Sequence, residues 1–216
     1  MNNLQACIFD MDGVLVSTEK YHFFAWKELA ESLGFTIDEV FNEQLKGVSR
    51  AVCIDLILQK GGVNVSSDEK QHLSDKKNTK YLEYISTISR NDVLPGVVSL
   101  LEELRKHGIK TAVGSASKNA PFLLEKLELT PFFDAIVDGT QITQPKPHPE
   151  VFLKGAEKMN VQPQKCIVFE DAQSGVLAAK SAGMYCVGIG NPAILSEADM
   201  CVSGVYEISY LDLATL

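Results

Sequence analysis

The strongest constraint on the fold is a regular alternation of short apolar runs and helical patterns in the second half of the chain. The runs typical of buried strands are residues 109–114, 135–137, 166–169 and 185–189, followed by a short apolar segment at 200–202. Helical patterns lie between or beside them, at residues 97–106, 119–127, 149–159 and 174–182. Strands that alternate with helices in this way predict a parallel sheet covered on both faces. We therefore expect a doubly wound α/β fold.

A further strand is predicted at residues 5–9, and a long helical block separates it from the others. Helical patterns cover residues 20–33, 50–59 and 68–86, with Gly34 as the stop of the first and Ser66 or Ser67 as the N-cap of the third. No segment between residues 20 and 86 is typical of a strand. We therefore expect a helical cap domain, residues 16–92, inserted after strand one into a core domain of residues 1–15 and 93–216. A short helix is expected within residues 208–216.

Composition excludes several classes of partner. The net charge is −8, which disfavours nucleic acid or an anionic membrane as the main partner, although local basic groups can still bind a small anion. The 45% hydrophobic and 22% charged content is ordinary for a globular protein. The five cysteines form no C-x-x-C pair, and the sequence has neither a signal pattern nor an apolar run of about 18 residues. We expect a monomer in the reducing cytoplasm.

Two carboxylates follow the first predicted strand. Asp10 and Asp12 stand two residues apart, so both side chains can project from the same side of an extended segment, and Gly13 follows as a turn signal. In open α/β sheets, ligands bind at the carboxyl ends of the strands. Like charges this close need a cation or a proton to offset their repulsion. Taken alone, the motif is also compatible with an ordinary acidic turn.

Three other strand ends carry polar residues. Ser115 follows the strand at 109–114, Lys146 lies in a proline-rich loop, and Glu170 and Asp171 follow the strand at 166–169. Each has an ordinary alternative, namely a helix N-cap, a solvated loop lysine and an acidic helix start. Together with Asp10 and Asp12 on one rim, they would hold a hard cation beside a phosphate.

These motifs, in this order, closely resemble the haloacid dehalogenase superfamily of phosphotransferases, including the helical cap inserted after strand one. The resemblance implies that Asp10 is the nucleophile that forms an aspartyl-phosphate and that Asp12 is the general acid/base. It also implies that Asp10, the backbone carbonyl of Asp12, Glu170 and Asp171 bind Mg²⁺. Ser115 and Lys146 would hold the transferring phosphoryl oxygens. A carboxylate is a competent nucleophile toward phosphorus once charge repulsion is offset.

Three longer segments resemble the β-phosphoglucomutase family within that superfamily: residues 18–23, 42–50 and 115–126. The resemblance implies interconversion of β-glucose 1-phosphate and glucose 6-phosphate, with β-glucose 1,6-bisphosphate as activating intermediate. A bisphosphate requires a second anion site. Arg50 of the cap would supply it together with Ser117, Lys118 and Asn119 of the core.

Other positions match family residues that engage substrate or couple cap closure to Asp12. They are Thr18, His22, Lys46, Gly47, Val48, Lys77 and Ala116. For His22, a structural role beside Trp26 is the alternative, and we interpret His107 and His148 as structural. The family pattern usually has Asp where this chain has Ser17, in the first connector between the expected domains. We expect this difference to alter either hinge behaviour or a local hydrogen bond and to leave the metal ligands intact.

The favoured function is therefore a cytoplasmic, Mg²⁺-dependent sugar-phosphate mutase. A sugar-phosphate phosphatase of the same superfamily is the first alternative, with water in place of the second sugar hydroxyl. A non-catalytic sugar-phosphate sensor is the second alternative, and the intact set of Asp10, Asp12 and Lys146 argues against it, because a sensor needs no nucleophile. The sequence leaves the sugar, the anomer and the feeding pathway open.

Overall fold

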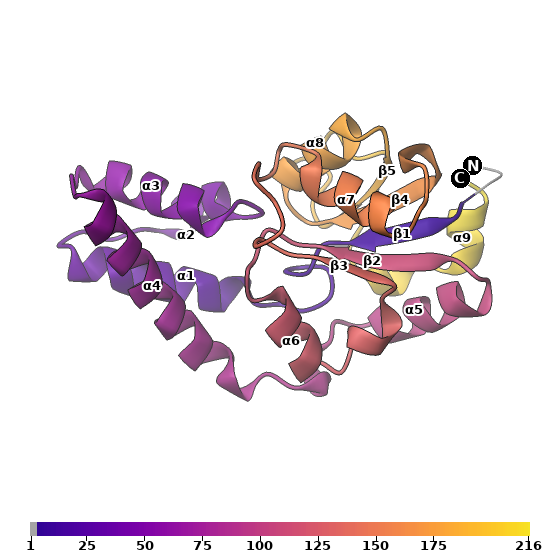
Figure 1. The fold of residues 1–216 in the computed structure, drawn as a ribbon, viewed down its shortest axis with the longest axis horizontal. Helices are drawn as coiled ribbons and strands as arrows, with labels where there is room; N and C mark the ends of the chain where they lie inside the picture. The colour runs from indigo at the N-terminus through magenta and orange to yellow at the C-terminus, as the bar shows by residue number, and fades with distance from the viewer. Residues whose placement is uncertain (1–3) are drawn as a thin grey trace.

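A computed structural model describes residues 4–216 and contains a six-stranded parallel sheet at one end and a group of helices at the other (Figure 1). The strands lie in the order β3-β2-β1-β4-β5-β6. Their bounds are Ala6–Phe9 (β1), Lys110–Gly114 (β2), Ala135–Val137 (β3), Cys166–Glu170 (β4), Tyr185–Ile189 (β5) and Met200–Val202 (β6). The expected parallel sheet is confirmed. β4 is one residue longer than predicted, so Glu170 ends this strand rather than following it.

Helices cover both faces of the sheet, as a doubly wound fold requires. One face carries α5 (Val97–Lys106), α6 (Ala120–Lys126) and α9 (Tyr210–Ala214), and the other carries α7 (Glu150–Lys158) and α8 (Gln173–Ser181). The side chains of β1 alternate between the two faces, with Phe9 in the first cluster and Ile8 in the second. Phe9 stacks on Phe169 with ring centroids 4.6 Å apart. Full burial of such a side chain stabilises the fold by roughly 1.5–3 kcal/mol.

The inserted helices have a hydrophobic core of their own. They are α1 (Glu19–Ser32), α2 (Glu39–Asn42), α3 (Arg50–Gly61) and α4 (Ser67–Tyr84). Their buried faces meet around Trp26, Ile54 and Leu73, separately from the two clusters on the sheet. We refer to these helices as the cap and to the sheet with its five helices as the core. The exact boundaries at residues 16 and 92 stay a prediction.

Local sequence explains where the cap helices begin and end. The Ser66 hydroxyl accepts a hydrogen bond from the Glu69 N–H at 3.2 Å and so caps α4. Gly62 ends α3 in a left-handed conformation, with φ +63°. α2 was not predicted, because its four residues are too few to show a helical period. Its signal was Asp38, whose side chain accepts from the Phe41 N–H at 2.8 Å.

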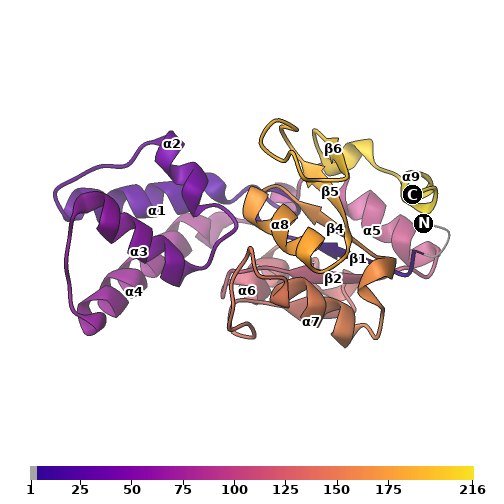
Figure 2. The same ribbon diagram turned by 90° about the horizontal axis from the view of Figure 1, so that it is seen from above.

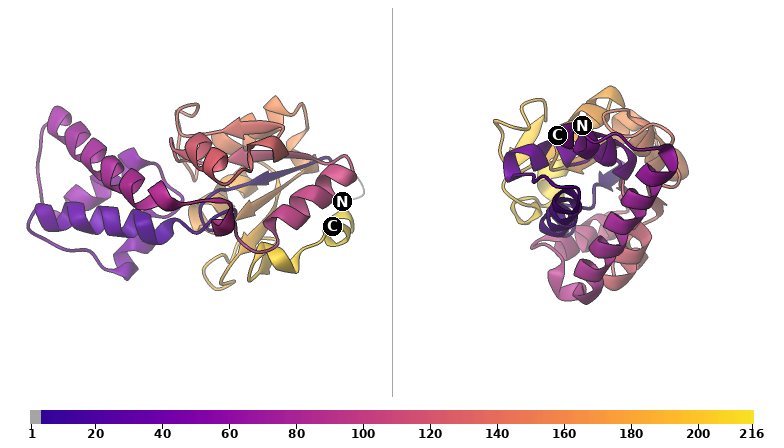
Figure 3. Two further views of the ribbon diagram at one scale, coloured as in Figure 1. Left: turned by 90° about the horizontal axis from the view of Figure 1, so that it is seen from below. Right: turned by 90° about the vertical axis from the view of Figure 1, so that its left-hand side faces the viewer.

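Two chain segments join the cap to the core and run side by side. The Leu94 N–H donates to the Leu15 carbonyl at 2.9 Å, and Val16 and Val93 form an antiparallel bridge. Leu15, Val16 and Ile88 belong to the hydrophobic cluster that also contains Phe9. Figures 2 and 3 show the cap attached at the end of the molecule opposite α9. Rotation of the cap would therefore bend one paired strip of backbone rather than two independent linkers.

Two further expectations can be compared with this fold. All five cysteines are free. Across residues 4–216, no helix combines the length and the apolarity needed to cross a membrane.

Candidate active site

Three carboxylates meet at the carboxyl end of the central strands. Asp10 follows β1, Glu170 ends β4 and Asp171 comes next, and each offers an oxygen within 4.8 Å of the others. β1 and β4 are adjacent and in register, so their ends are level. Two glycines make room for the cluster: a Cβ at Gly13, which has φ +78°, would overlap Asp171, and a Cβ at Gly175 would overlap Glu170. Glycine at these two positions therefore leaves the space that the side chains of Asp171 and Glu170 occupy.

Lys146 lies buried at the centre of the cluster. Its Nζ is 2.6 Å from Asp10 Oδ1 and also contacts Glu170 Oε1, and the second Glu170 oxygen accepts from the Ala172 N–H at 2.9 Å. Burial disfavours a charged lysine, but the charges of Asp10 and Glu170 outweigh it and raise the pKa of Lys146. Lys146 is therefore a fixed positive charge beside Asp10.

The residues of this cluster fit a divalent cation. Three carboxylates face a single ammonium, so negative charge is in excess. Burial is the main cause that raises the pKa of Asp171, and the Glu170 charge and a hydrogen bond with Glu19 add to it. Clustered carboxylate oxygens are the ligands that Mg²⁺ prefers. Among the described residues, the cluster does not include a side-chain oxygen of Asp12, and coordination by its backbone carbonyl stays a prediction.

Asp12 has the properties of a proton donor. Its Oδ1 is buried and has no hydrogen-bond partner among residues 4–216. Burial, followed by the charges of Asp10 and Glu19, raises the pKa of Asp12 to about 8 in the metal-free protein. A carboxyl group in this state carries its proton near neutral pH and can give it to a developing alkoxide.

One cavity of about 570 Å³ lies between cap and core. Most of the predicted site residues line it: Asp10, Asp12, His22, Lys46, Gly47, Val48, Arg50, Lys77, Ser115, Ala116, Ser117, Lys118, Asn119 and Asp171. Thr18, Lys146 and Glu170 are buried behind its wall. The cavity thus brings the carboxylate cluster and the predicted second anion site onto one surface. A direct role for Thr18 in substrate binding stays a prediction.

Inside the cap, His22 and Lys77 form a close pair. Lys77 Nζ lies 2.8 Å from Nδ1 of His22, and the His22 ring stacks on Tyr81 with centroids 3.9 Å apart. Burial, together with the charges of Lys77 and Arg50, lowers the pKa of His22 well below its usual value. Burial lowers the pKa of Lys77 to about 7. His22 thus has a packing contact with Tyr81 and also lines the cavity.

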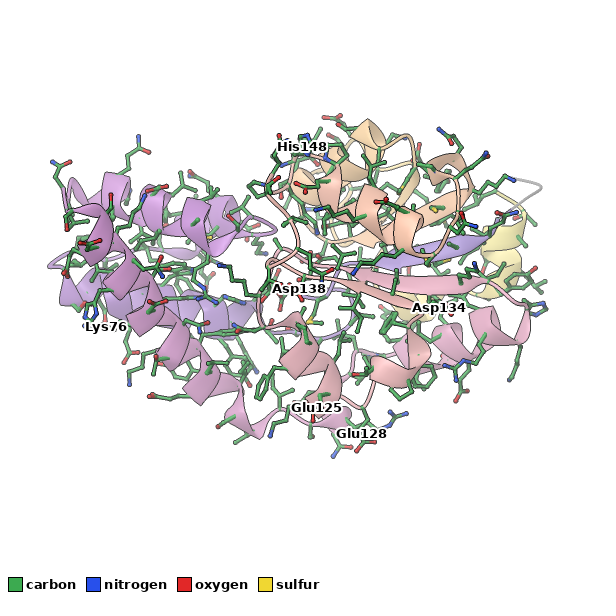
Figure 4. All side chains as sticks on the ribbon, in the orientation of Figure 1. Lys76, Glu125, Glu128, Asp134, Asp138 and His148 are labelled. Atoms are coloured by element: carbon green, nitrogen blue, oxygen red, sulfur yellow. The ribbon has the colours of Figure 1, made fainter. Side chains whose placement is uncertain are left out.

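Sequence reasoning missed several residues at this site. Glu19 lines the cavity, and its Oε2 lies 3.3 Å from Lys46 Nζ. Asp138 follows β3 at the same edge of the sheet and holds the next loop by accepting from the Thr140 N–H at 2.7 Å (Figure 4). Its position after a strand was the available signal. For Glu19 the only signal was its place between Thr18 and Lys20 at the start of a helix.

A second cavity of about 360 Å³ lies beside the first connector. Ser17, Gly13, Glu19 and Asp171 contribute to its wall. Ser17 of the first connector therefore lines the same cavity as Asp171 of the carboxylate cluster. His107 stacks on Tyr210 with ring centroids 3.7 Å apart. His148 accepts a hydrogen bond from the Glu150 N–H at the surface of the core (Figure 4). A structural role for both residues stays a prediction.

Comparison with known proteins defines the class. Residues 4–183 match the haloacid dehalogenase-like hydrolase family, and the chain belongs to that family. Within it, the chain belongs to the β-phosphoglucomutase-like subfamily. It is 42% identical to a β-phosphoglucomutase of Bacillus subtilis over 201 residues, which cover 92% of this chain and 89% of that protein. These findings confirm the resemblance seen in the sequence.

Two further similar proteins are a mutase and a phosphatase. The crystal structure of a β-phosphoglucomutase from Clostridium difficile superposes with a TM-score of 0.96 at 41% identity, covering 98% of this chain and 96% of the other. A phosphorylated carbohydrates phosphatase of Thermotoga maritima is 35% identical over 184 residues, which cover 84% of this chain and 82% of that protein. The chain is thus a sugar-phosphate enzyme of this family.

Proposed function

We propose that the protein is a Mg²⁺-dependent β-phosphoglucomutase that interconverts β-D-glucose 1-phosphate and glucose 6-phosphate through β-glucose 1,6-bisphosphate. The single observation that carries the proposal is that Asp10, Asp12 and Asp171 line the same cavity as Arg50, Ser117, Lys118 and Asn119. A bisphosphate needs one anion site at the nucleophile and another at the far phosphate. The greater identity to a mutase than to a phosphatase supports the same choice.

In the first half-reaction, an Asp10 carboxylate oxygen attacks phosphorus of the bisphosphate and the bond from phosphorus to the sugar oxygen breaks. Lys146, 2.6 Å from Asp10, reduces the repulsion between the carboxylate and the phosphoryl oxygens. Asp12 gives its proton to the departing sugar oxygen. The products are an aspartyl-phosphate on Asp10 and a sugar monophosphate.

In the second half-reaction, the sugar monophosphate presents its other hydroxyl to the aspartyl-phosphate. Asp12, now ionised, accepts the proton of that hydroxyl while the hydroxyl oxygen attacks phosphorus, and the bond to Asp10 breaks. Arg50, Ser117, Lys118 and Asn119 hold whichever phosphate is not reacting. Mg²⁺ held by Asp10, Glu170, Asp171 and the Asp12 carbonyl would neutralise charge on the transferring phosphoryl group when bound.

The chief alternative is a sugar-phosphate phosphatase, in which water takes the place of the second hydroxyl. The relative in Thermotoga maritima supports this reading. A non-catalytic sugar-phosphate sensor is the less favoured alternative. We retain the expectations of a monomer in the cytoplasm that acts on small sugar phosphates, without nucleic-acid or membrane partners.

Phosphorus NMR distinguishes these functions. Purified protein is incubated with β-glucose 1-phosphate, Mg²⁺ and a trace of bisphosphate, with Asp10→Asn as the matched inactive control. The mutase predicts growth of the glucose 6-phosphate signal with little inorganic phosphate. Release of inorganic phosphate from several sugar phosphates without isomerisation would identify a phosphatase, and binding without any turnover would identify a sensor.

A further inference from the structure

Apart from the two connectors, the cap touches the core on both sides of the cavity. On one side, the Ser174 hydroxyl donates to the Lys46 carbonyl at 3.4 Å, and a Cβ at Gly47 would crowd Ala172. On the other side, Asn119 Nδ2 of the core donates to Asn78 Oδ1 of the cap at 2.9 Å. The second contact is between two side chains, one of which lines the cavity.

Asn78 lies on α4 between residues that are buried in the cap and residues that are exposed. The preceding residue, Lys77, is buried inside the cap, and Lys76 lies exposed on the outer side of α4 (Figure 4). Asn78 is half-buried and faces the core. A single turn of helix therefore presents a buried lysine, a surface lysine and the amide that reaches the core.

The Asn119 side chain contacts the cap and does not cap its own helix. It stands at the N-cap position of α6, where an asparagine side chain normally accepts from a backbone N–H of the first turn. Its side chain makes no such bond and instead contacts Asn78. The Asn119 oxygen is therefore not engaged in capping α6, and it can accept a hydrogen bond when the amide turns.

The same loop contains an ordered series of hydrogen bonds. The Ser117 N–H donates to the Ser115 hydroxyl at 3.1 Å, and the Asn119 N–H donates to the Ser117 hydroxyl at 3.2 Å. Both hydroxyl oxygens act as acceptors here, so their own hydrogens can be directed to an anion in the cavity. The Asn119–Asn78 bond extends this series from the end of β2 across the cavity edge into the cap.

We propose that Asn78 is a positioning residue that orients the Asn119 amide and links occupation of the Ser117–Asn119 anion site to the position of the cap. This inference rests on the proposed function, since it takes the loop as a phosphate site. A fully ionised phosphate only accepts hydrogen bonds, so Asn119 binds it through its NH₂ group, and we infer that the amide turns to direct both hydrogens of this group toward the anion. Asn78 can then donate to the freed Asn119 oxygen, because an amide offers both a donor and an acceptor. Either orientation preserves one hydrogen bond between cap and core.

The test is a double-mutant cycle with Asn78→Ala, Asn119→Ala and the combined variant, read as kcat and KM for β-glucose 1-phosphate and as the ratio of isomerisation to phosphate release. Loss of one hydrogen bond predicts a fall of about threefold to tenfold in kcat/KM for Asn78→Ala, with more phosphate released. Because Asn78 acts through Asn119, it should have no further effect in the Asn119→Ala background. Lys76→Ala, on the outer side of the same helix, is the matched control.

A second variant separates positioning from simple folding. Asn78→Asp retains the acceptor but cannot donate, so it should keep thermal stability near wild type and still lower kcat/KM at high salt, where charge repulsion is screened. Active wild type with unchanged Asn78→Ala kinetics, or equal effects of Asn78→Ala with and without Asn119, would overturn the inference alone. Wild type without isomerisation would overturn the proposed function and this inference together.

Discussion

Lys146 Nζ lies 2.6 Å from Oδ1 of Asp10, and the same ammonium contacts Glu170, so one buried cation joins the ends of β1 and β4. The pair is buried, which strengthens the attraction and also makes an unpartnered charge costly. Lys146 therefore has two roles: it stabilises the metal-free cluster, and it reduces the negative charge that an incoming phosphate meets.

The first prediction concerns this balance of charge. Lys146→Met should destabilise the metal-free protein by about 3–5 kcal/mol, because Asp10 and Glu170 lose their ammonium partner. Saturating Mg²⁺ should raise the melting temperature of Lys146→Met more than that of wild type, since the cation replaces the missing positive charge. Differential scanning calorimetry with and without Mg²⁺ measures both effects, with Lys76→Met as control. Equal stabilisation by Mg²⁺ in wild type and Lys146→Met would contradict a shared charge site.

Arg50 provides the second prediction. Arg50→Ala should lower kcat/KM for β-glucose 1-phosphate by roughly tenfold to a hundredfold, the cost of losing a charge-assisted contact. It should also increase phosphate release relative to isomerisation, because the bisphosphate escapes more often. Lys60→Ala, an exposed residue of the same helix, is the control for nonspecific effects of charge. A loss confined to stability, with normal kinetics, would remove Arg50 from the anion site.

The Lys77–His22 pair predicts a pH dependence of stability. Burial lowers the pKa of Lys77 from 10.5 to about 7, so between these values the unfolded chain binds more protons than the folded protein. Lys77 should therefore contribute a positive slope to the free energy of unfolding of the ligand-free protein above about pH 7, of at most about 1.4 kcal/mol per pH unit, which the raised pKa of Asp12 opposes up to about pH 8. Lys77→Met should remove this slope in urea titrations at pH 7 to 9, and Lys76→Met should retain it. An identical slope in Lys77→Met would show that Lys77 is charged in the folded protein.

The paired connectors predict a hinge motion of the cap. Neither domain alone encloses a bisphosphate, so Mg²⁺ with a phosphate analogue and sugar phosphate should reduce the radius of gyration in small-angle scattering. An unchanged radius at saturating ligand would count against closure. Ser17→Asp should shift this equilibrium more than the Kd for Mg²⁺. A dominant change in the Kd for Mg²⁺ would instead assign Ser17 to the surroundings of Asp171, because both residues line the second cavity.

The fold was predictable because its signals are local and repeated. Every strand of the sheet shows an apolar run. Asp10, Ser115 and Asp171 each come directly after a strand, at the carboxyl edge of the sheet. α2 lacked enough residues for a period. The sequence analysis also placed the end of the α4 pattern at residue 86, whereas the α-helix ends at Tyr84 and continues as a 3₁₀ turn, Ile85–Thr87.

The missing parts of the site depend on contacts that no single segment specifies. The Asn78–Asn119 bond joins residues 41 positions apart. Glu19 acquires its place beside Lys46 only when α1 and the loop before α3 pack together. Likewise, the lowered pKa of Lys77 results from burial by several helices, which a helical pattern in one segment cannot reveal.

The most direct measurement is the partition of the phosphorylated enzyme. The protein is phosphorylated with a small acyl phosphate in the presence of Mg²⁺, the modified peptide is mapped by mass spectrometry, and glucose 6-phosphate is then added. We predict that the phosphoryl group lies on Asp10, is absent from Asp10→Asn, and passes to the sugar phosphate to form the bisphosphate faster than it passes to water. A phosphoryl group on another residue, or its complete loss as inorganic phosphate in the presence of saturating glucose 6-phosphate, would contradict the account.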